Sequence, residues 1–330
     1  MSFEWPSDFA RTPDEDWTIG PVEELARNYD TVEAHGWYKN LEPTIADLRA
    51  YLSSGRLLMD YSAGTGILEK HLLSGRADFG VLLVDSSPKF LRLALEKFRG
   101  DERVAFRLIR YQKDKSRLQY VDEVLSPKLR ERGFDAIVST NAIHLYYDLP
   151  ETLACWKRLL RAQANIFVQS GNIGNSKKDA DHWIIDDTVE AIHRAALSIV
   201  EDDDRYATYR DGLLDRERMA AYDRLRRKFF LPVRPLDYYL EALENAGLHV
   251  TDVSYIPYEA TLSDWYEFLS AYHEGALGWI GGSVRIEGKP PADESVRDRM
   301  RLMRDAMEHV FGGRASFVAG WTYIRAESAT

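Results

Sequence analysis

A loop that contains two glycines follows the first apolar stretch of the chain. Its sequence runs Asp60-Tyr61-Ser62-Ala63-Gly64-Thr65-Gly66. Glycines directly after a strand and before a helix allow a tight turn and let a ligand approach the backbone closely. Asp85 lies 21 residues after Gly64, at the end of the next apolar stretch. An acid there can accept hydrogen bonds from both hydroxyls of a ribose, so the pattern predicts a nucleoside-binding site.

The residues around this loop indicate which nucleoside derivative fits. A dinucleotide-binding loop needs a third glycine, but Glu69 occupies that position. Asp60 is acidic as well, and a carboxylate beside the loop repels a pyrophosphate. The same carboxylate suits a ligand that carries an ammonium and a sulfonium group. The loop therefore favours S-adenosylmethionine over NAD or FAD.

The loop, Asp85, and Asn141 after the apolar stretch 134–140 together resemble the class I S-adenosylmethionine-dependent methyltransferase family, of the small-molecule type. The resemblance covers about residues 45–170, 235–260 and 315–326. It implies a Rossmann-like, mostly parallel seven-stranded α/β sheet with helices on both faces, whose last strand is antiparallel and lies between the fifth and sixth. It also implies S-adenosyl-L-methionine as cofactor and S-adenosyl-L-homocysteine as product.

The resemblance assigns roles near the cofactor: ribose binding to Asp85, and a place beside the methionine amino group to Asp60. The residues that we expect to bind the cofactor are Asp60, Ser62, Ala63, Gly64, Gly66, Asp85, Ser86, Tyr111, Asn141, Tyr29 and Tyr38. Tyr29 and Tyr38 match a place where related enzymes close a lid, although helix packing explains them equally. For adenine, the family often has an acid after the third strand; here Asp114 lies near that place in the sequence, and stacking by Tyr111 and a hydrogen bond from Gln112 stay open equally.

Three residues at the ends of later strands are candidate catalytic residues: Asn141, His144 and Ser170. Ligands bind at the carboxyl ends of strands in open α/β sheets. His144 could act as a general base because imidazole titrates near neutrality, or it could cap a helix or fill the core. Ser170 ends the fifth predicted strand, where a polar exit turn is the alternative.

Aromatic residues are unusually frequent, at 12% of the chain. As a group, those in and beside the predicted insertions suggest an aromatic-lined chamber for a substrate; for each alone, core packing is the safer interpretation. The predicted substrate residues are Tyr146, Asn172, His182, Trp183, Tyr239 and Tyr255. The eight histidines are dispersed without metal-ligand spacing, so we expect no metal.

The elements that position these residues alternate along the chain. Apolar runs at 57–61, 79–85, 104–109, 134–140 and 164–170 predict strands buried on both faces, with amphipathic helices between them. A helix at 235–246 and strands at 248–256 and 315–326 follow. We expect a helical extension or lid at 1–50, a cofactor-binding sheet core at 51–172, a helical cap insertion at 173–234, and the rest of the sheet at 235–330 with a second helical insertion at 262–312.

Composition limits the remaining possibilities. The net charge of −10 disfavours a nucleic-acid partner, and the chain contains no apolar run of membrane-spanning length. The single cysteine, Cys155, is compatible with a reducing environment, so we expect a cytoplasmic protein. A homodimer is left open.

We therefore expect a transferase that methylates a small-molecule acceptor, as in the biosynthesis of a specialised metabolite. One alternative keeps the cofactor but cyclises or eliminates it, releasing methylthioadenosine. A second alternative is a non-catalytic cofactor-binding protein that acts through a partner.

Overall fold

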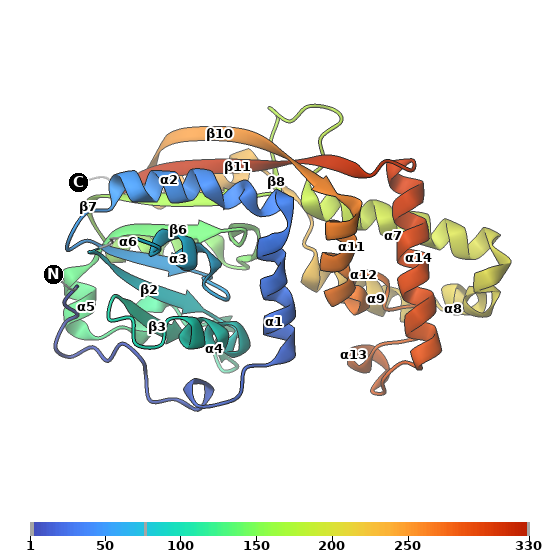
Figure 1. The fold of residues 1–330 in the computed structure, drawn as a ribbon, viewed down its shortest axis with the longest axis horizontal. Coiled ribbons are helices and arrows are strands. Elements are labelled where there is room, and N and C mark those ends of the chain that lie inside the picture. Colours follow the sequence, from blue (N-terminus) through green and yellow to red (C-terminus); the bar gives the residue numbers. More distant parts are fainter. Residues whose placement is uncertain (1–2, 76–77, 329–330) are drawn as a thin grey trace.

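The computed structural model describes residues 3–75 and 78–328 and contains a central seven-stranded sheet (Figure 1). The strand order is β10-β11-β7-β6-β1-β2-β3. The strands are β1 (Leu57–Tyr61), β2 (Gly80–Asp85), β3 (Val104–Leu108), β6 (Phe134–Thr140), β7 (Leu160–Ser170), β10 (Leu248–Thr261) and β11 (Ser316–Ser328). β1, β2, β3, β6 and β7 pair in parallel, whereas β11 is antiparallel to both of its neighbours. The predicted antiparallel last strand between the fifth and sixth is confirmed.

The central strands are buried on both faces, which explains their nearly continuous apolar sequence. In β1, Leu58 packs in one hydrophobic cluster, while Leu57 and Met59 pack in another on the opposite face. This alternation follows from the two-residue period of a strand. Each face therefore needs its own layer of helices.

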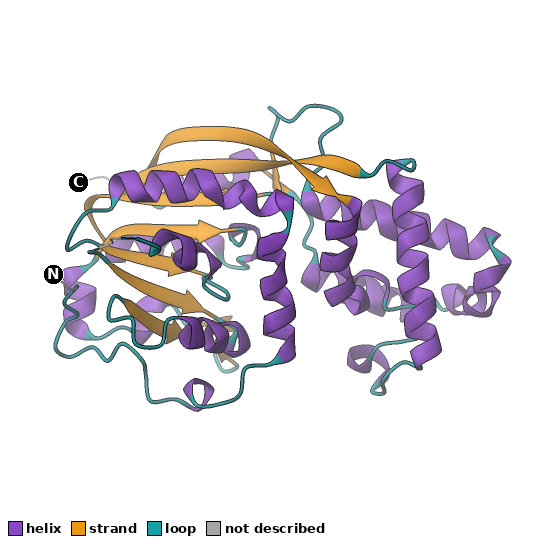
Figure 2. Cartoon of the chain, viewed as in Figure 1, coloured by secondary structure: helices purple, strands orange, loops and turns teal. Residues whose placement is uncertain are grey.

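Helices cover both faces of the sheet (Figure 2). One layer comprises α2 (Glu42–Tyr51), α3 (Ile67–Leu72) and α4 (Pro88–Lys97). The other comprises α5 (Pro127–Arg132), α6 (Leu149–Leu159) and α10 (Leu236–Asn245). Ser87 caps α4 by accepting from the Phe90 amide, and Asp148 caps α6 by accepting from the Glu151 amide. These caps satisfy amides that a helix leaves free.

The remaining helices form a lobe beside the sheet (Figures 1 and 2). Between β7 and α10 lie the short strands β8 (Ile173–Gly174) and β9 (Arg234–Pro235) and the helices α7 (Ile185–Asp202), α8 (Arg210–Leu214) and α9 (Arg216–Phe229). Between β10 and β11 lie α11 (Leu262–Ala271), α12 (His273–Leu277), α13 (Val284–Glu287) and α14 (Asp293–Phe311). We call these seven helices the helical lobe.

A buried arginine braces the helical lobe from within. Arg299 of α14 is fully buried and donates hydrogen bonds to the backbone carbonyls of Gly278, Ile280 and Gly282. A guanidinium has five N–H donors, so one side chain can hold several carbonyls of a loop. The bend between α12 and α13 therefore depends on Arg299.

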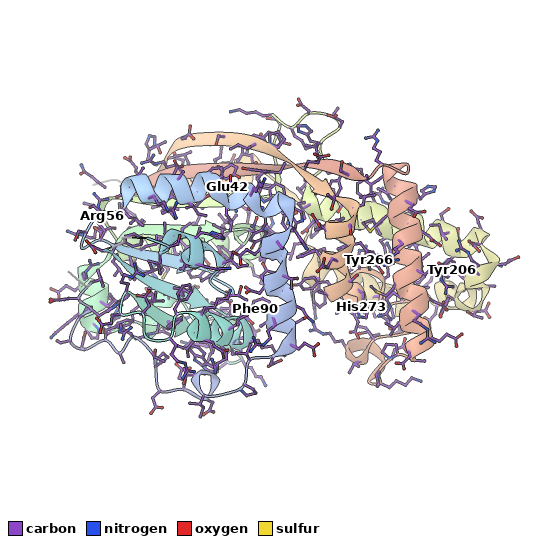
Figure 3. All side chains as sticks on the ribbon, in the orientation of Figure 1. Glu42, Arg56, Phe90, Tyr206, Tyr266 and His273 are labelled. Atoms are coloured by element: carbon purple, nitrogen blue, oxygen red, sulfur yellow. The ribbon has the colours of Figure 1, made fainter. Side chains whose placement is uncertain are left out.

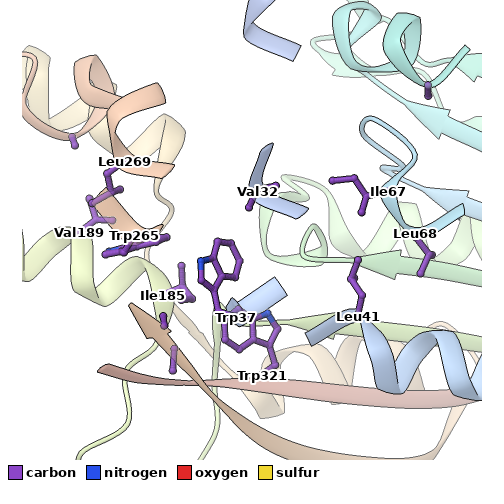
Figure 4. Packing of buried hydrophobic residues seen from close by; sticks show 14 of the residues in the cluster. Val32, Trp37, Leu41, Ile67, Leu68, Ile185, Val189, Trp265, Leu269 and Trp321 are labelled. Atoms are coloured by element: carbon purple, nitrogen blue, oxygen red, sulfur yellow. The ribbon is translucent and has the colours of Figure 1, made fainter. Parts of the chain in front are cut away.

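Aromatic residues join the helical lobe to the sheet in one continuous core (Figure 4). Trp37, which precedes α2, stacks on Trp321 of β11 with ring centroids 5.9 Å apart. It also meets Trp265 of α11 edge to face at 6.2 Å. Helix α1 (Glu24–Asp30) stands between the sheet and the helical lobe (Figure 1). Among the described residues, no helix is both long enough and apolar enough to span a bilayer.

Candidate active site

The glycine loop connects β1 to α3 and is held by the neighbouring strand. The amides of Ser62 and Ala63 both donate to the carbonyl of Val84 in β2, at 2.8 and 3.0 Å. Gly64 and Gly66 have positive φ angles of 57° and 75°. Glycine adopts this region without the steric cost that a Cβ would add. The loop therefore turns sharply at the carboxyl edge of the sheet, as predicted.

Asp85 lies beside this loop at the end of β2. Its carboxylate accepts from the Gly64 amide at 2.7 Å and from the Ser87 amide at 2.7 Å. Burial raises the pKa of Asp85, and the hydrogen bonds from Ser87, Gly64 and Ser86 partly offset this rise. Ser86 itself is exposed. The carboxylate is thus oriented by the glycine loop with lone pairs left for a ligand.

Beneath the loop, the predicted cofactor residue Asp60 has a second acid beside it, Glu69, to which the sequence assigned no ligand. Asp60 and Glu69 are buried neighbours, and no described residue outside this pair donates a hydrogen bond to either carboxyl group. Burial raises the pKa of Asp60 well above its usual value, and the charge of Glu69 raises it further. Burial also raises the pKa of Glu69. Two buried carboxyls without other donors favour a cationic group beside them, because it would stabilise their charge.

The N-terminal extension is fastened to the glycine loop. Asp30, at the end of α1, accepts from the Thr65 hydroxyl and from the Lys97 ammonium, both at 2.6 Å. The preceding residue, Tyr29, stacks on Phe90 of α4 with centroids 4.9 Å apart; Figure 3 shows Phe90 beside α1. The extension therefore covers the side of the loop that faces α4.

The predicted lid tyrosines, Tyr29 and Tyr38, lie beside each other, and Tyr29 is near Asp85. Burial raises the pKa of Tyr29, the Tyr38 hydroxyl lowers it, and the negative charge of Asp85 raises it again. Both side chains are half-buried. Tyr111 is in a different position: it lies on the short hairpin of β4 (Tyr111–Gln112) and β5 (Arg117–Leu118) and is 59% exposed. Its predicted contact with adenine remains a prediction.

Asn141, at the end of β6, is held by residues far from it in the sequence. Its Oδ1 accepts from the indole N–H of Trp321 at 2.8 Å, and its Nδ2 donates to Oδ1 of Asn40 at 3.4 Å. The same Asn40 oxygen accepts from Gln169 Nε2 at 2.9 Å. Asn141 has a φ of 53°, a region that asparagine tolerates better than most residues. Asn40, Gln169 and Trp321 were missed because no local motif marks them.

The two other candidate catalytic residues meet on the opposite face of β7. Nδ1 of His144 is 3.0 Å from the Ser170 hydroxyl, and Nε2 is 3.1 Å from Nδ2 of Asn172. Asn172 Oδ1 accepts from the Asp186 amide at 2.7 Å. Burial lowers the pKa of His144 to about 3, so the ring is neutral at physiological pH. Asp186, at the start of α7, is a further member that the sequence did not single out.

The six predicted substrate residues are distributed over several places. The Tyr146 hydroxyl supports the glycine loop through the Ser62 hydroxyl and the Tyr61 carbonyl. His182 Nδ1 is 3.1 Å from the Tyr255 hydroxyl, whereas the Trp183 ring packs on Phe311. Tyr239 is fully buried in α10, and Asn172 belongs to the His144 network. A single aromatic chamber around all six is therefore not formed by their side chains alone.

Two cavities lie away from these residues. One, of about 390 Å³, lies between α6 and α10 and is lined by residues such as Glu151, Ala154 and Tyr238. The other, of about 40 Å³, lies between α2 and the strands β7, β10 and β11. Neither is lined by the glycine loop or Asp85. Within residues 3–75 and 78–328, no three His, Cys, Asp or Glu side chains are grouped so that they could hold a metal ion.

Comparison with known proteins agrees with this geometry. A methyltransferase domain model matches residues 59–166. A "Probable O-methyltransferase" of Mycobacterium tuberculosis is 33% identical over 162 residues, which cover 47% of this chain and 65% of that protein. A candidate O-methyltransferase of Mycobacterium ulcerans is 32% identical over 165 residues, 48% of this chain and 66% of that protein. The chain thus spans just under two thirds of the length of these relatives.

The fold has a counterpart among solved structures. The YcgJ protein of Bacillus subtilis superposes with a TM-score of 0.50 at 12% identity, covering 89% of this chain and 99% of that one. The open face of Gly64 and the carboxyls of Asp85, Asp60 and Glu69 fit a cofactor with a ribose and an ammonium group. With the strand order and the similarity of residues 59–166 to a methyltransferase domain, they support a class I S-adenosylmethionine-dependent methyltransferase.

Proposed function

We propose that this protein transfers the methyl group of S-adenosylmethionine to a small-molecule acceptor. The observation that carries the proposal is the position of Asp85, whose carboxylate is held beside the glycine loop by the Gly64 and Ser87 amides. Support also comes from the buried acids Asp60 and Glu69, which lack a donor outside their own pair among the described residues. These groups match a ribose and an ammonium respectively, so one ligand would satisfy both.

The chain's own residues contribute binding and alignment in this proposal. Asp85 would accept hydrogen bonds from the ribose, Asp60 and Glu69 would bind the ammonium, and Gly64 would let the ligand approach the backbone. When bound, the cofactor supplies a methyl group on a positively charged sulfur. Alignment of two reactants can supply roughly 7–11 kcal/mol of the barrier, so a strong base is not required for an acceptor that is already nucleophilic.

The role of His144 follows from its hydrogen bonds. Asn172 Nδ2 can only donate, so Nε2 of His144 must accept and has no free lone pair for a substrate proton. A pKa of about 3 also makes the ring a weak base at neutral pH. We infer that His144 positions Ser170 and Asn172 rather than accepting the substrate's proton.

The acceptor class is inferred from charge and from the relatives' names. The net charge of −10 disfavours a nucleic-acid substrate, because binding a phosphate backbone needs basic residues. The mycobacterial relatives are named O-methyltransferases, which favours an oxygen acceptor. A small molecule with a nucleophilic oxygen is therefore the proposed substrate.

Isothermal titration with S-adenosylmethionine tests the cofactor half of the proposal. We expect saturable binding by the wild type and loss of binding by Asp85→Ala, with an unchanged circular dichroism spectrum. No binding at millimolar cofactor, or equal binding by the variant, would overturn it. Mass spectrometry after incubation with cofactor and a panel of phenols and carboxylic acids tests the transfer. Methylthioadenosine release without a methylated product would indicate cyclisation or elimination instead.

A further inference from the structure

Four side chains on elements that adjoin the carboxyl end of β7 have hydrogen-bonding or charge capacity that the described residues do not fully satisfy. They are Ser170, Asp186, Arg234 and Tyr239, which we call the donor cluster. Arg234 pairs with Ile173 in the β8–β9 ladder, directly after Asn172. This ladder lies where the sheet meets the helical lobe, and helix α7 begins there (Figure 1). The cluster therefore lies on the α6 and α10 side of the candidate active site.

The hydrogen-bond network determines where the protons are. The Asp186 amide donates to Asn172 Oδ1 at 2.7 Å, which fixes the orientation of that side-chain amide. Asn172 Nδ2 therefore donates to Nε2 of His144 at 3.1 Å, and the ring proton must be on Nδ1. Nδ1 of His144 then donates to the Ser170 hydroxyl at 3.0 Å, and the backbone amide of Asn172 donates to the same oxygen at 3.0 Å.

This arrangement leaves the Ser170 hydroxyl proton without an acceptor. Its oxygen receives two hydrogen bonds, and no further partner of this side chain occurs among the described residues. Ser170 is fully buried, so bulk water does not replace the missing acceptor. A buried donor without a partner is costly unless a ligand or an ordered water satisfies it.

The two residues from β9 and α10, Arg234 and Tyr239, are also incompletely paired. Tyr239 is fully buried, and its hydroxyl has no hydrogen-bond partner among the described residues. Arg234 donates to the Tyr238 hydroxyl at 3.1 Å and lies 4.8 Å from the centre of that ring. Within the described part of the chain, no carboxylate forms an ion pair with Arg234, so its charge is available.

Arg234 lies close to Tyr239 along the chain, because β9 runs directly into α10, and the β8–β9 pairing places Arg234 opposite Ile173. The charge of Arg234 lowers the pKa of His144 and also that of Tyr239, although burial is the largest effect on each. Burial raises the pKa of Asp186 to about 8, so this carboxyl is largely protonated at neutral pH. Its Oδ2 is buried and has no partner among the described residues. In its protonated form Asp186 is a donor rather than a competing anion.

We propose that the donor cluster binds an anionic group, a carboxylate or a phosphate, on the methyl acceptor. Such a group offers several lone pairs to the Ser170 and Tyr239 hydroxyls and a charge to the Arg234 guanidinium. A cationic group would instead face Arg234, and an apolar group would leave both hydroxyls unsatisfied. The inference rests on the proposed function and adds that the acceptor is an acid.

Matched neutral and charged probes test the proposal. S-adenosylhomocysteine is first titrated into the wild type, and its binding reports on the cofactor site alone. Benzoate, phenyl phosphate, benzamide and benzylamine are then titrated at pH 6.5 into the protein saturated with S-adenosylhomocysteine. We expect binding of benzoate or phenyl phosphate, and the comparison of the two distinguishes carboxylate from phosphate. Equal binding of benzamide, preference for benzylamine, or no anion binding at tens of millimolar would overturn the proposal.

Two substitutions of Arg234 test whether the anion binds at the donor cluster. Arg234→Leu should weaken the preferred anion about tenfold or more, and Arg234→Lys, which keeps the charge, should weaken it less. Both variants should bind S-adenosylhomocysteine as the wild type does. If the wild type does not bind S-adenosylhomocysteine, the proposed function is refuted rather than the anion site. Anion binding unchanged by Arg234→Leu would show that the anion binds elsewhere.

Tyr239→Phe provides a readout that a purely structural role would not give. Because the hydroxyl has no partner in the free protein, its removal should raise the melting temperature without ligand. The same substitution should reduce the increase in melting temperature that the anion causes. A variant that melts lower than the wild type and responds equally to the anion would contradict the assignment of Tyr239.

Discussion

Replacing Gly64 by alanine separates the contribution of the glycine loop to folding from its contribution to cofactor binding. Gly64 has a φ of 57°, and this left-handed region costs a residue with a Cβ about 1–2 kcal/mol. A Cβ at Gly64 meets no atom within 4 Å, so it adds no clash. We expect Gly64→Ala to lower the unfolding free energy by about 1–2 kcal/mol and to leave the fold intact.

Gly66→Ala is the matched control from the same loop. Its φ of 75° brings the same backbone cost, but its added Cβ lies 2.7 Å from Cε2 of Phe98. Overpacking of this kind costs typically about 1–3 kcal/mol more. Gly66→Ala should therefore lose about 2–5 kcal/mol in total. Urea denaturation followed by circular dichroism measures both losses, and the difference between the variants isolates the clash with Phe98.

The order of Gly64→Ala and Gly66→Ala in cofactor affinity should differ from their order in unfolding free energy. The open face of Gly64 is where the proposed ligand approaches, so its new methyl group should reduce affinity for S-adenosylmethionine about tenfold or more. Isothermal titration at a temperature where both variants are folded gives the dissociation constants. If Gly64→Ala binds the cofactor as tightly as the wild type, the ligand does not pass over this face and the reasoning is wrong.

Three further substitutions test other parts of the structure. Asp85→Asn removes the charge from two backbone hydrogen bonds and from the proposed ribose contact, and should weaken S-adenosylmethionine about tenfold to hundredfold in isothermal titration; unchanged affinity would contradict the proposed ribose contact. The folded state raises the pKa of Asp186 to about 8, so the folded protein keeps this proton while the unfolded chain loses it near pH 4. The free energy of unfolding should therefore fall as the pH rises from about 4 to 8. Asp186→Asn should abolish this loss and be more stable than the wild type at pH 8; parallel stability curves in urea denaturation between pH 5 and 8.5 would refute it. Arg299→Leu leaves three buried carbonyls without donors and should destabilise by roughly 3–5 kcal/mol in urea denaturation, whereas Arg301→Ala on the same helix should change stability little; similar losses in both would show that Arg299 does not brace the lobe.

The sheet could be predicted closely because its strands are buried on both faces. The apolar runs at 57–61 and 134–140 coincide with β1 and β6. Burial on two sides forces a continuous apolar sequence, and the turns require glycine and capping residues that are visible locally. For the same reason, the sequence alone locates the glycine loop and Asp85 at the ends of their strands. Strand β10 extends beyond its predicted end because its antiparallel pairing with β11 continues toward the helical lobe, whereas β11 extends by two residues at the opposite end of this pair.

The polar networks could not be predicted, because their members are distant in the sequence. Asn40, Asn141 and Trp321 meet only after the N-terminal extension and the last strand have packed against β6. No local pattern distinguishes Asp186 from its acidic neighbour, or Arg234 from the many other arginines. Asp186 and Arg234 differ from similar residues because the fold determines how far each is buried and which partners it contacts. Tyr111 shows the converse: a residue at the expected place in the sequence lies on an exposed hairpin.

The stacked contact of Trp37 on Trp321 limits how this molecule can open. Since one apolar core runs from the sheet face through these rings to Trp265, separation of the helical lobe would expose that core to water. Such an opening carries the cost of partial unfolding, so lobe and sheet should unfold together in a single transition. The α1 segment is fastened instead by polar contacts such as Asp30 with Thr65 and Lys97, which water can replace. Entry and exit of ligands should therefore depend on movement of the N-terminal segment, and turnover should be sensitive to salt.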